Sequence, residues 1–269
     1  MKLDLHTHTT YSDGDLDING NVSKAKELGL DGIAITDHDN IDSWKEIDEN
    51  NYPIIVIKGV ELSTHYKGES VHILGYYLND GGDYSKLDEF LIKTREDRIK
   101  RLDKMIYLLS EMGINLTRKE ILKEADGAVA RPHVAKAIMK KYPELGLTND
   151  DIFDKYIGNN SPAYVPVNNF QTIDAIKLLK DNHCLVVLAH PLLIKKFDYK
   201  ELLALGLDGI ECFYKYDFSH KEDVLKFALN NNLLVTGGSD YHGPKTRDSI
   251  GNSYLEGDEC KTFLKKINN

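Results

Sequence analysis

The chain of 269 residues lacks several features that would place it in particular classes of protein. Its three cysteines, Cys184, Cys212 and Cys260, are far apart, which excludes a disulfide framework and a zinc finger and suits reduced thiols. No stretch approaches the roughly 18 apolar residues of a membrane helix, and the first residues contain no apolar segment of a secretory signal. We therefore expect a cytoplasmic protein that does not enter a membrane.

The chain also contains fewer positively than negatively charged residues. The chain carries 34 Lys and Arg against 43 Asp and Glu, a net charge of −9, which argues against binding of duplex DNA along a broad basic surface. An anionic substrate is still compatible with this balance, because a cluster of divalent metal ions creates a local positive field. A small, locally bound anion is favoured over a long polymer, and the sequence carries no pattern that defines an oligomeric state.

What the sequence does contain is a series of short apolar runs typical of buried strands. They are Leu3–Leu5, Ile33–Thr36, Ile54–Ile57, Val71–Tyr77, Leu185–Leu188, Ile210–Tyr214 and Leu233–Thr236. Helical segments such as Ile173–Leu179 and Lys221–Leu229 separate the later runs, and this alternation predicts parallel β/α units. Polar residues directly follow several of the runs, as in an α/β barrel whose loops converge on one mouth.

The middle of the chain is different, because no convincing core strand occurs there. Lys86–Met112 has apolar residues at mostly helical spacing, and shorter helical segments follow around Arg118–Glu124, Pro132–Lys140 and Asp150–Ile157. We interpret residues 80–160 as a helical insertion in a discontinuous barrel domain made of residues 1–79 and 161–269. An insertion between strands that bear site residues tends to border the site, so we favour a lid over a mere decoration.

Nine residues of the types that bind metals lie almost entirely at the predicted strand ends. They are His6, His8, Asp13, His38, Glu61, His72, His190, Asp240 and His242. Alternate side chains of an extended segment face the same side, so the two imidazoles of His6 and His8 can reach one ion, and Asp240 and His242 repeat this spacing.

A single histidine at a strand end is usually a packing or turn residue, but nine such residues are hard to explain by packing. Buried charged or imidazole groups need partners, and metal ions supply them. Mixed nitrogen and oxygen ligands suit Mn²⁺, Fe²⁺ or Zn²⁺ better than Ca²⁺ or Mg²⁺. The sequence therefore predicts a site for divalent transition metals.

These residues stand in motifs that resemble those of the PHP (polymerase and histidinol phosphatase) family of metal-dependent phosphoesterases. The motifs are His-Thr-His, Ser-Asp-Gly, Thr-Asp-His, Gly-Val-Glu, Ala-His-Pro and Ser-Asp-Tyr-His. The resemblance implies a distorted (β/α)7 barrel and two or three divalent ions. One ion would be held by His6, His8, Glu61 and Asp240, a second by His72, His190 and a shared Glu61, and a third by Asp13, His38 and His242.

Two further motifs, one in the insertion and one directly after it, sharpen this resemblance. Ala130-Arg131-Pro132-His133-Val134-Ala135 and Pro162-Ala163-Tyr164-Val165-Pro166 resemble the branch that acts on nucleoside 3′,5′-bisphosphates and short RNA 5′ ends. The resemblance implies that Arg131, His133 and Tyr164 bind substrate, and Arg131 suits a second phosphate. Arg95, Arg98 and Arg101, spaced by three along the long helix, are interpreted as a solvated face, with a phosphate pocket as the alternative.

Metal ions in such a site activate a bridging water as the nucleophile and neutralise phosphoryl charge. We therefore expect hydrolysis of phosphate monoesters of small nucleotides, with Glu61 and Asp240 as the catalytic residues among the ligands. Histidinol phosphate hydrolysis, amide or lactone hydrolysis, and a non-catalytic metal-stabilised binding module are the alternatives. Glu211, inside an apolar strand, is interpreted as structural.

Overall fold

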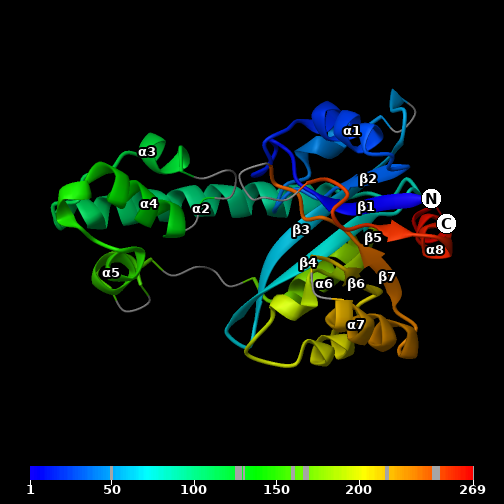
Figure 1. The fold of residues 1–269 in the computed structure, drawn as a ribbon. Coiled ribbons are helices and arrows are strands. Elements are labelled where there is room, and N and C mark those ends of the chain that lie inside the picture. Colours follow the sequence, from blue (N-terminus) through cyan, green and yellow to red (C-terminus); the bar gives the residue numbers. More distant parts are fainter. Residues whose placement is uncertain are drawn as a thin grey trace. The chain divides into compact units, whose positions relative to one another are not determined.

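The structure is a computed structural model that describes residues 1–48, 51–124, 129, 131–158, 161–165, 170–215, 218–243 and 249–268. The chain divides into two compact units, Met1–Leu91 with Asn169–Asn269, and Ile92–Asn168. The first unit contains the strands and the second consists of helices (Figure 1). Residue 160, the expected end of the insertion, lies outside the described residues. Within the described ranges, no helix is both long enough and apolar enough to cross a bilayer.

One mixed sheet of the first unit runs in the order β7-β6-β5-β4-β3-β2-β1-β8 within the described part of the chain. Its strands are β1 (Lys2–Thr7), β2 (Gly32–Ile35), β3 (Ile55–Tyr66), β4 (Glu69–Tyr77), β5 (Cys184–Leu188), β6 (Gly209–Phe213), β7 (Leu234–Gly237) and β8 (Leu255–Glu256). The first seven match the apolar runs of the sequence. The two-residue β8 is too short to leave a hydrophobic pattern, so the sheet has one strand more than we expected.

The two ends of the sheet approach each other beside β1. The amide of Asp240 donates to the carbonyl of His6 at 2.8 Å, and the amide of His8 donates to the carbonyl of Tyr241 at 2.9 Å. Thr7 and Tyr241 also form an isolated parallel bridge. This near closure, with strands that follow chain order, confirms the predicted distorted α/β barrel. It also places residues 240–242 beside residues 6–8.

The strands are not all parallel, because β3 turns directly back into β4. Lys67 and Gly68, at the turn between them, both have positive φ angles, 48° and 76°. So short a connection allows only an antiparallel pair, since a parallel pair needs a long crossover. β3 is therefore longer than its apolar run: its start pairs parallel with β2, and residues 59–66 pair antiparallel with β4. Glu61 lies just beyond the parallel part.

Helices pack on the sheet of the first unit and complete its core. They are α1 (Ile18–Glu27), α6 (Thr172–Asp181), α7 (Phe218–Asn230), α8 (Asp258–Ile267) and the start of α2 (Ser85–Glu111). Leu179 of α6, Val224 of α7 and Phe263 of α8 are fully buried in one cluster with the strand residues. This burial fixes the strands and therefore the side chains at their ends.

The second unit contains the rest of α2 together with α3 (Arg118–Leu122), α4 (Arg131–Lys141) and α5 (Asn149–Ile152), which continues into a π-helical turn, Phe153–Ile157. It has its own buried cluster, in which Leu102, Met105 and Leu109 of α2 pack with Val134 and Ile138 of α4. Capping boxes at Thr117 and Thr148 begin α3 and α5.

Candidate metal centre

All nine predicted ligands are in the first unit, and their side chains meet in one cluster, with Glu61 and His72 inside β3 and β4 and the others in the segments after strands or, for His6, near the end of β1. Within the described residues, ligand-type atoms gather in three overlapping groups whose members lie within 4.8 Å of one another. The groups are His8, Asp13, His38 and His242; His6, His8, Glu61 and Asp240; and His38, Glu61 and His72. His190 joins them through Glu61, because its Nε2 lies 3.0 Å from Oε1 of that carboxylate.

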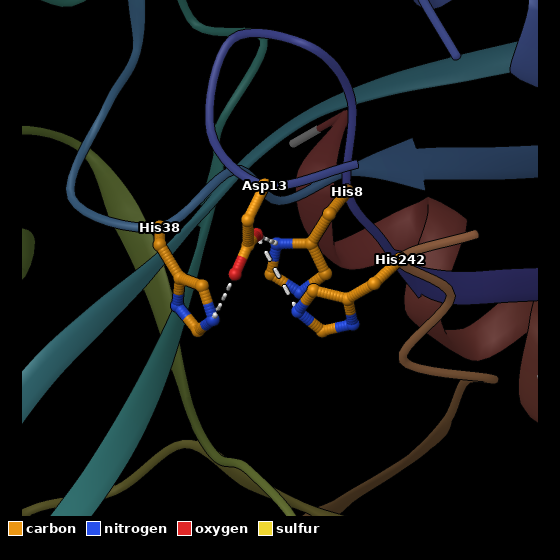
Figure 2. A group of neighbouring side chains, drawn as sticks. All are labelled: His8, Asp13, His38 and His242. Atoms are coloured by element: carbon orange, nitrogen blue, oxygen red, sulfur yellow. Dashed lines mark ion pairs between the residues drawn. The ribbon is translucent and has the colours of Figure 1, made fainter. Parts of the chain in front are cut away.

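Asp13 is the centre of the first group (Figure 2). Its Oδ1 lies 3.6 Å from Nδ1 of His8 and 3.4 Å from Nε2 of His242, and its Oδ2 lies 3.8 Å from Nε2 of His38. The side chains come from the loop after β1, the end of β2 and the end of β7. These positions converge because β1 pairs with β2 on one side and meets the segment after β7 on the other.

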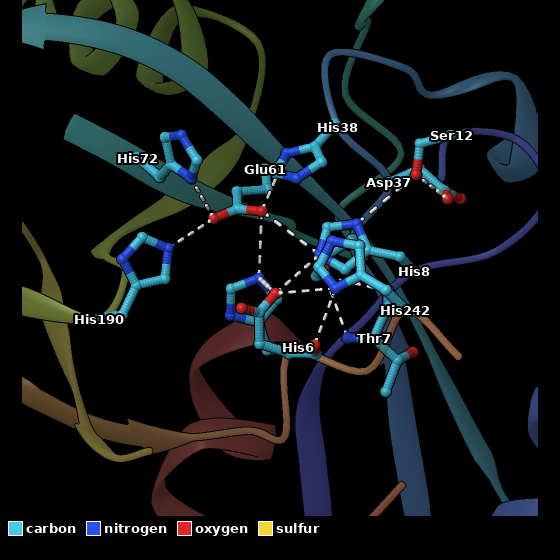
Figure 3. A network of polar contacts seen from close by, with 12 residues as sticks. His6, Thr7, His8, Ser12, Asp37, His38, Glu61, His72, His190 and His242 are labelled. Atoms are coloured by element: carbon cyan, nitrogen blue, oxygen red, sulfur yellow. Dashed lines mark hydrogen bonds and ion pairs between the residues drawn. The ribbon is translucent and has the colours of Figure 1, made fainter. Parts of the chain in front are cut away.

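Glu61 belongs to both of the other groups, and its two oxygens face different sets of histidines (Figure 3). Its Oε2 lies 3.2 Å from Nε2 of His6, 3.3 Å from Nε2 of His8 and 3.0 Å from Nδ1 of His38. Its Oε1 lies 2.9 Å from Nδ1 of His72, on the same side as His190. A carboxylate that faces two sets of imidazoles in this way is arranged to bridge two cations.

Asp240 completes the group around His6 and His8. Its Oδ1 lies 3.3 Å from Nε2 of His6 and 3.2 Å from Nε2 of His8. The other oxygen, Oδ2, accepts a hydrogen bond of 2.9 Å from the hydroxyl of Tyr214. The Tyr214 hydroxyl therefore orients the carboxylate so that one defined oxygen faces the histidines.

The spacing of these atoms fits divalent metal ions. Two ligand atoms about 2.1 Å from a common ion at a tetrahedral angle lie about 3.4 Å apart, close to the separations found here. His6 Nε2 and Glu61 Oε2 are buried, yet neither has a hydrogen-bond partner among the described residues, and the same holds for His38 Nδ1 and Asp13 Oδ1. Buried polar atoms are rarely left unpaired, and an ion would satisfy all four.

The electrostatics of the cluster lead to the same conclusion. Burial alone would lower the pKa of His8, but the neighbouring Asp240 and Glu61 carboxylates raise it to about 10. Burial alone would raise the pKa of Glu61, but the positive charges of His38, His6 and His72 hold it well below its usual range. Imidazolium groups thus balance the negative charge of the buried carboxylates. Divalent cations bound between the same side chains would balance this charge as well.

Asp37 holds the loop that carries Asp13. Its Oδ1 accepts from the amide of Thr9 and the hydroxyl of Ser12, both at 2.7 Å, and its Oδ2 accepts from the hydroxyl of Thr9 at 2.8 Å. Asp4 acts similarly on the other side of the site, because it accepts from the amides of Ser239 and Gly251 at 2.9 and 2.8 Å. Burial raises the pKa of Asp4 to about 6.

We interpreted Glu211 as structural, and the structure places its side chain directly against the candidate metal centre. The Glu211 side chain is fully buried and contacts two of the predicted ligands, His6 and His190. A signal was present in the sequence, since Glu211, like Asp4, is a charged residue within an apolar strand run. A buried carboxylate needs a hydrogen-bond partner. The partner of Glu211 that is nearer in the sequence, the amide of His190, lies 21 residues away.

The predicted substrate-binding residues, Arg131, His133 and Tyr164, lie in the second unit. The Arg131 guanidinium packs over the rings of Phe153 and Tyr164, at 5.6 and 5.5 Å from their centres, and donates to the carbonyl of Ile157 at 3.3 Å. His133 follows on α4 and is half-buried. Arg131 is thus held by neighbouring side chains of its own unit.

Arg131 also lines a pocket within this unit. The pocket is lined by Arg98, Arg101, Leu102, Met105, Val129, Arg131 and Val134. Arg101 donates from Nε to the carbonyl of Val165 at 2.8 Å, and one of its terminal nitrogens is buried without a hydrogen-bond partner among the described residues. Burial and the neighbouring charge of Arg131 lower the pKa of Arg101. Three guanidinium groups around one pocket favour an anion.

Known proteins resemble the chain over most of its length. A family model described as PHP domain matches residues 4–208. A 5′-3′ exoribonuclease of Haemophilus influenzae is 29% identical over 256 residues, covering 90% of each chain. A phosphoribosyl 1,2-cyclic phosphate 1,2-diphosphodiesterase of Eggerthella lenta is 26% identical over 253 residues, covering 90% of this chain and 95% of that one.

Two further proteins are similar in sequence or in structure. A 3′,5′-nucleoside bisphosphate phosphatase of Chromobacterium violaceum is 28% identical over 261 residues, covering 90% of this chain and 87% of the relative. A solved structure from Bifidobacterium adolescentis, assigned as a metal-dependent phosphoesterase, superposes with a TM-score of 0.76 at 28% identity, covering 98% of this chain and 96% of that one. The matched family model spans seven of the nine predicted ligands, those from His6 to His190.

Proposed function

The chain belongs to the PHP domain family and is a metal-dependent phosphoesterase, and from this premise we propose that it hydrolyses phosphate monoesters of small nucleotides. Nucleoside 3′,5′-bisphosphates and short RNA 5′ ends are the substrates that we propose. The observation that carries the proposal is the sharing of Glu61 between two groups of imidazoles, a geometry suited to a multinuclear site. The arginine pocket of the second unit adds a place for a further phosphate.

We assign the nine side chains to two or three ions of Mn²⁺, Fe²⁺ or Zn²⁺. His6, His8, Glu61 and Asp240 would hold one ion, Glu61 with His72 and His190 a second, and Asp13, His38 and His242 a third. When bound, such ions activate water for attack and neutralise the charge of the phosphoryl oxygens. The protein's part is to fix the ligand atoms: Glu61 joins two ion positions, and Tyr214 leaves a single oxygen of Asp240 facing the histidines.

Elemental analysis of protein purified without chelator is expected to find more than one transition metal ion per chain. The expectation follows from three overlapping ligand groups, each able to hold an ion. Removing the metal with a chelator and restoring it with Mn²⁺ should abolish and then recover phosphate release. A stoichiometry of one ion or fewer after Mn²⁺ has been added would contradict a multinuclear site.

The substrate class is tested by a phosphate-release screen with added Mn²⁺. The panel contains nucleoside 3′,5′-bisphosphates, mononucleotides, short 5′-phosphorylated RNAs, a cyclic phosphate and histidinol phosphate, with Asp240→Asn as the control for contaminating phosphatase. We expect the bisphosphates or the RNAs to give the highest kcat/KM. Preference for histidinol phosphate or the cyclic phosphate would overturn the nucleotide assignment, and metal binding without any hydrolysis would indicate a non-catalytic module.

We propose that the second unit, inserted between β4 and β5, serves as a lid that supplies Arg131, His133 and Tyr164 to the substrate. The chain leaves the sheet soon after His72 and returns to it shortly before His190, so the insertion is flanked by ligand-bearing strands. In this role, Arg131 binds the phosphate that is not hydrolysed. Arg98 and Arg101 would add positive charge to the same pocket.

A further inference from the structure

We propose that Glu211 is a positioning residue of the metal centre that acts on two ligands at once, His6 and His190. Glu211 lies on β6, contacts no substrate in this role, and is fully buried. The inference rests on the metal centre proposed above and is independent of which phosphate ester is hydrolysed. Two contacts of the carboxylate carry it, one to a side chain and one to a backbone amide.

The first contact fixes the ring of His6. Oε1 of Glu211 lies 3.1 Å from Nδ1 of His6, and both side chains are buried. An ionised carboxylate only accepts hydrogen bonds, so this contact requires that Nδ1 carries the proton. In the neutral imidazole, the form able to bind a metal ion, the other ring nitrogen, Nε2, then carries the lone pair and faces Glu61 and Asp240. Glu211 thereby selects the form of His6 that binds a metal ion.

The second contact holds His190 in an unusual backbone conformation. His190 has φ 27° and ψ 61°, in the left-handed region that residues other than glycine rarely adopt, and it directly precedes Pro191. Oε2 of Glu211 accepts the His190 amide at 2.8 Å. A strained residue keeps its conformation only when its surroundings determine it, and this hydrogen bond does so. In that conformation, Nε2 of His190 lies 3.0 Å from Glu61.

Glu211 and Glu61 therefore close a ring of four residues with His6 and His190. Glu61 contacts the Nε2 atoms of both histidines from inside the cluster, while Glu211 contacts His6 and His190 from outside it. Both oxygens of Glu211 must accept, which an amide side chain of the same shape cannot do. A glutamine would place its NH₂ group against either a ring nitrogen that donates or a backbone amide that donates.

The test compares Glu211→Gln with Glu69→Gln in the full-length chain. Glu69 is the control, because both of its oxygens also accept hydrogen bonds, in this case from the amides of Lys195 and Lys196 at 2.8 and 2.6 Å, and it belongs to none of the ligand groups. Binding of Mn²⁺ is measured by the electron paramagnetic resonance of the free ion. We expect the apparent Kd to rise by about 10- to 100-fold in Glu211→Gln and to stay unchanged in Glu69→Gln.

A second measurement gives the answer even if Glu211→Gln fails to fold. Nitrogen-15 NMR of the unsubstituted chain loaded with diamagnetic Zn²⁺ should show His6 protonated at Nδ1 and ligated through Nε2. Ligation through Nδ1, or equal Mn²⁺ affinity in a folded Glu211→Gln variant, would overturn the inference. If the unsubstituted chain binds neither Mn²⁺ nor Zn²⁺, the proposed metal centre itself fails, and that outcome is distinct from the other two.

Discussion

Replacing Glu61 by glutamine is expected to lower turnover by about 10²-fold or more, with a parallel loss of bound metal. The substitution keeps the shape of the side chain but removes its negative charge. That charge lies where two cations would otherwise repel each other, since Oε1 and Oε2 face different sets of histidines. The effect should be at least as large as that of His72→Ala, which removes a ligand from only one of the two positions.

This prediction is tested by measuring turnover and metal content on the same preparations. Circular dichroism should show an unchanged fold, because glutamine is nearly isosteric with glutamate. Glu69→Gln, the same chemical change at the start of β4 and outside the ligand groups, should leave kcat and metal content unchanged. Near-normal turnover and metal content in Glu61→Gln would show that Glu61 is not a bridging ligand.

Replacing Arg131 by alanine is expected to weaken the use of a nucleoside 3′,5′-bisphosphate by about 2–4 kcal/mol in kcat/KM, the range for loss of a desolvated charge pair. This corresponds to a decrease of roughly 30- to 700-fold. Only one phosphoryl group of such a substrate reacts, and the other needs a partner elsewhere. Arg131 offers a planar set of donors and is held by Phe153 and Tyr164 in a pocket that Arg98 and Arg101 also line.

A substrate without a second phosphate separates recognition from catalysis. Hydrolysis of p-nitrophenyl phosphate should barely change in Arg131→Ala, whereas equal losses on both substrates would indicate a defect of folding or metal binding. Arg118→Ala is the matched control, because Arg118 lies in the same unit but pairs with Asp103 through two contacts, at 3.0 and 2.6 Å, away from the pocket lining. No loss on either substrate would leave Arg131 with a structural role.

The sequence predicted the fold class and the clustering of nine candidate ligands because both depend largely on local pattern. Apolar runs identify strands whatever they pair with, and the one-residue gap between His6 and His8 orients both rings toward the same side. In the structure, both Nε2 atoms lie close to the same oxygen of Glu61, at 3.2 and 3.3 Å. The alternation of short strands and helices was likewise sufficient to predict an α/β barrel.

Features that depend on pairing between distant segments were not predictable in this way. The continuation of β3 through Tyr66 follows from its hairpin with β4, because the residues after Glu61 are largely polar and form no apolar run. The role of Glu211 depends on His6, which is 205 residues away in the sequence. The pocket around Arg131 similarly requires the packing of α4 on α2, which helical periodicity alone does not define.

The rings of Phe90 and Phe170 are in contact, with centroids 4.6 Å apart, and these residues flank the helical unit on either side in the sequence. The chain therefore departs from the first unit and rejoins it at almost the same place. An insertion attached in this manner is modular, since its length and content can change while the strands and the ligands they carry keep their geometry. Evolution can thus exchange the inserted segment of such an enzyme and keep the geometry of the strand-borne ligands intact.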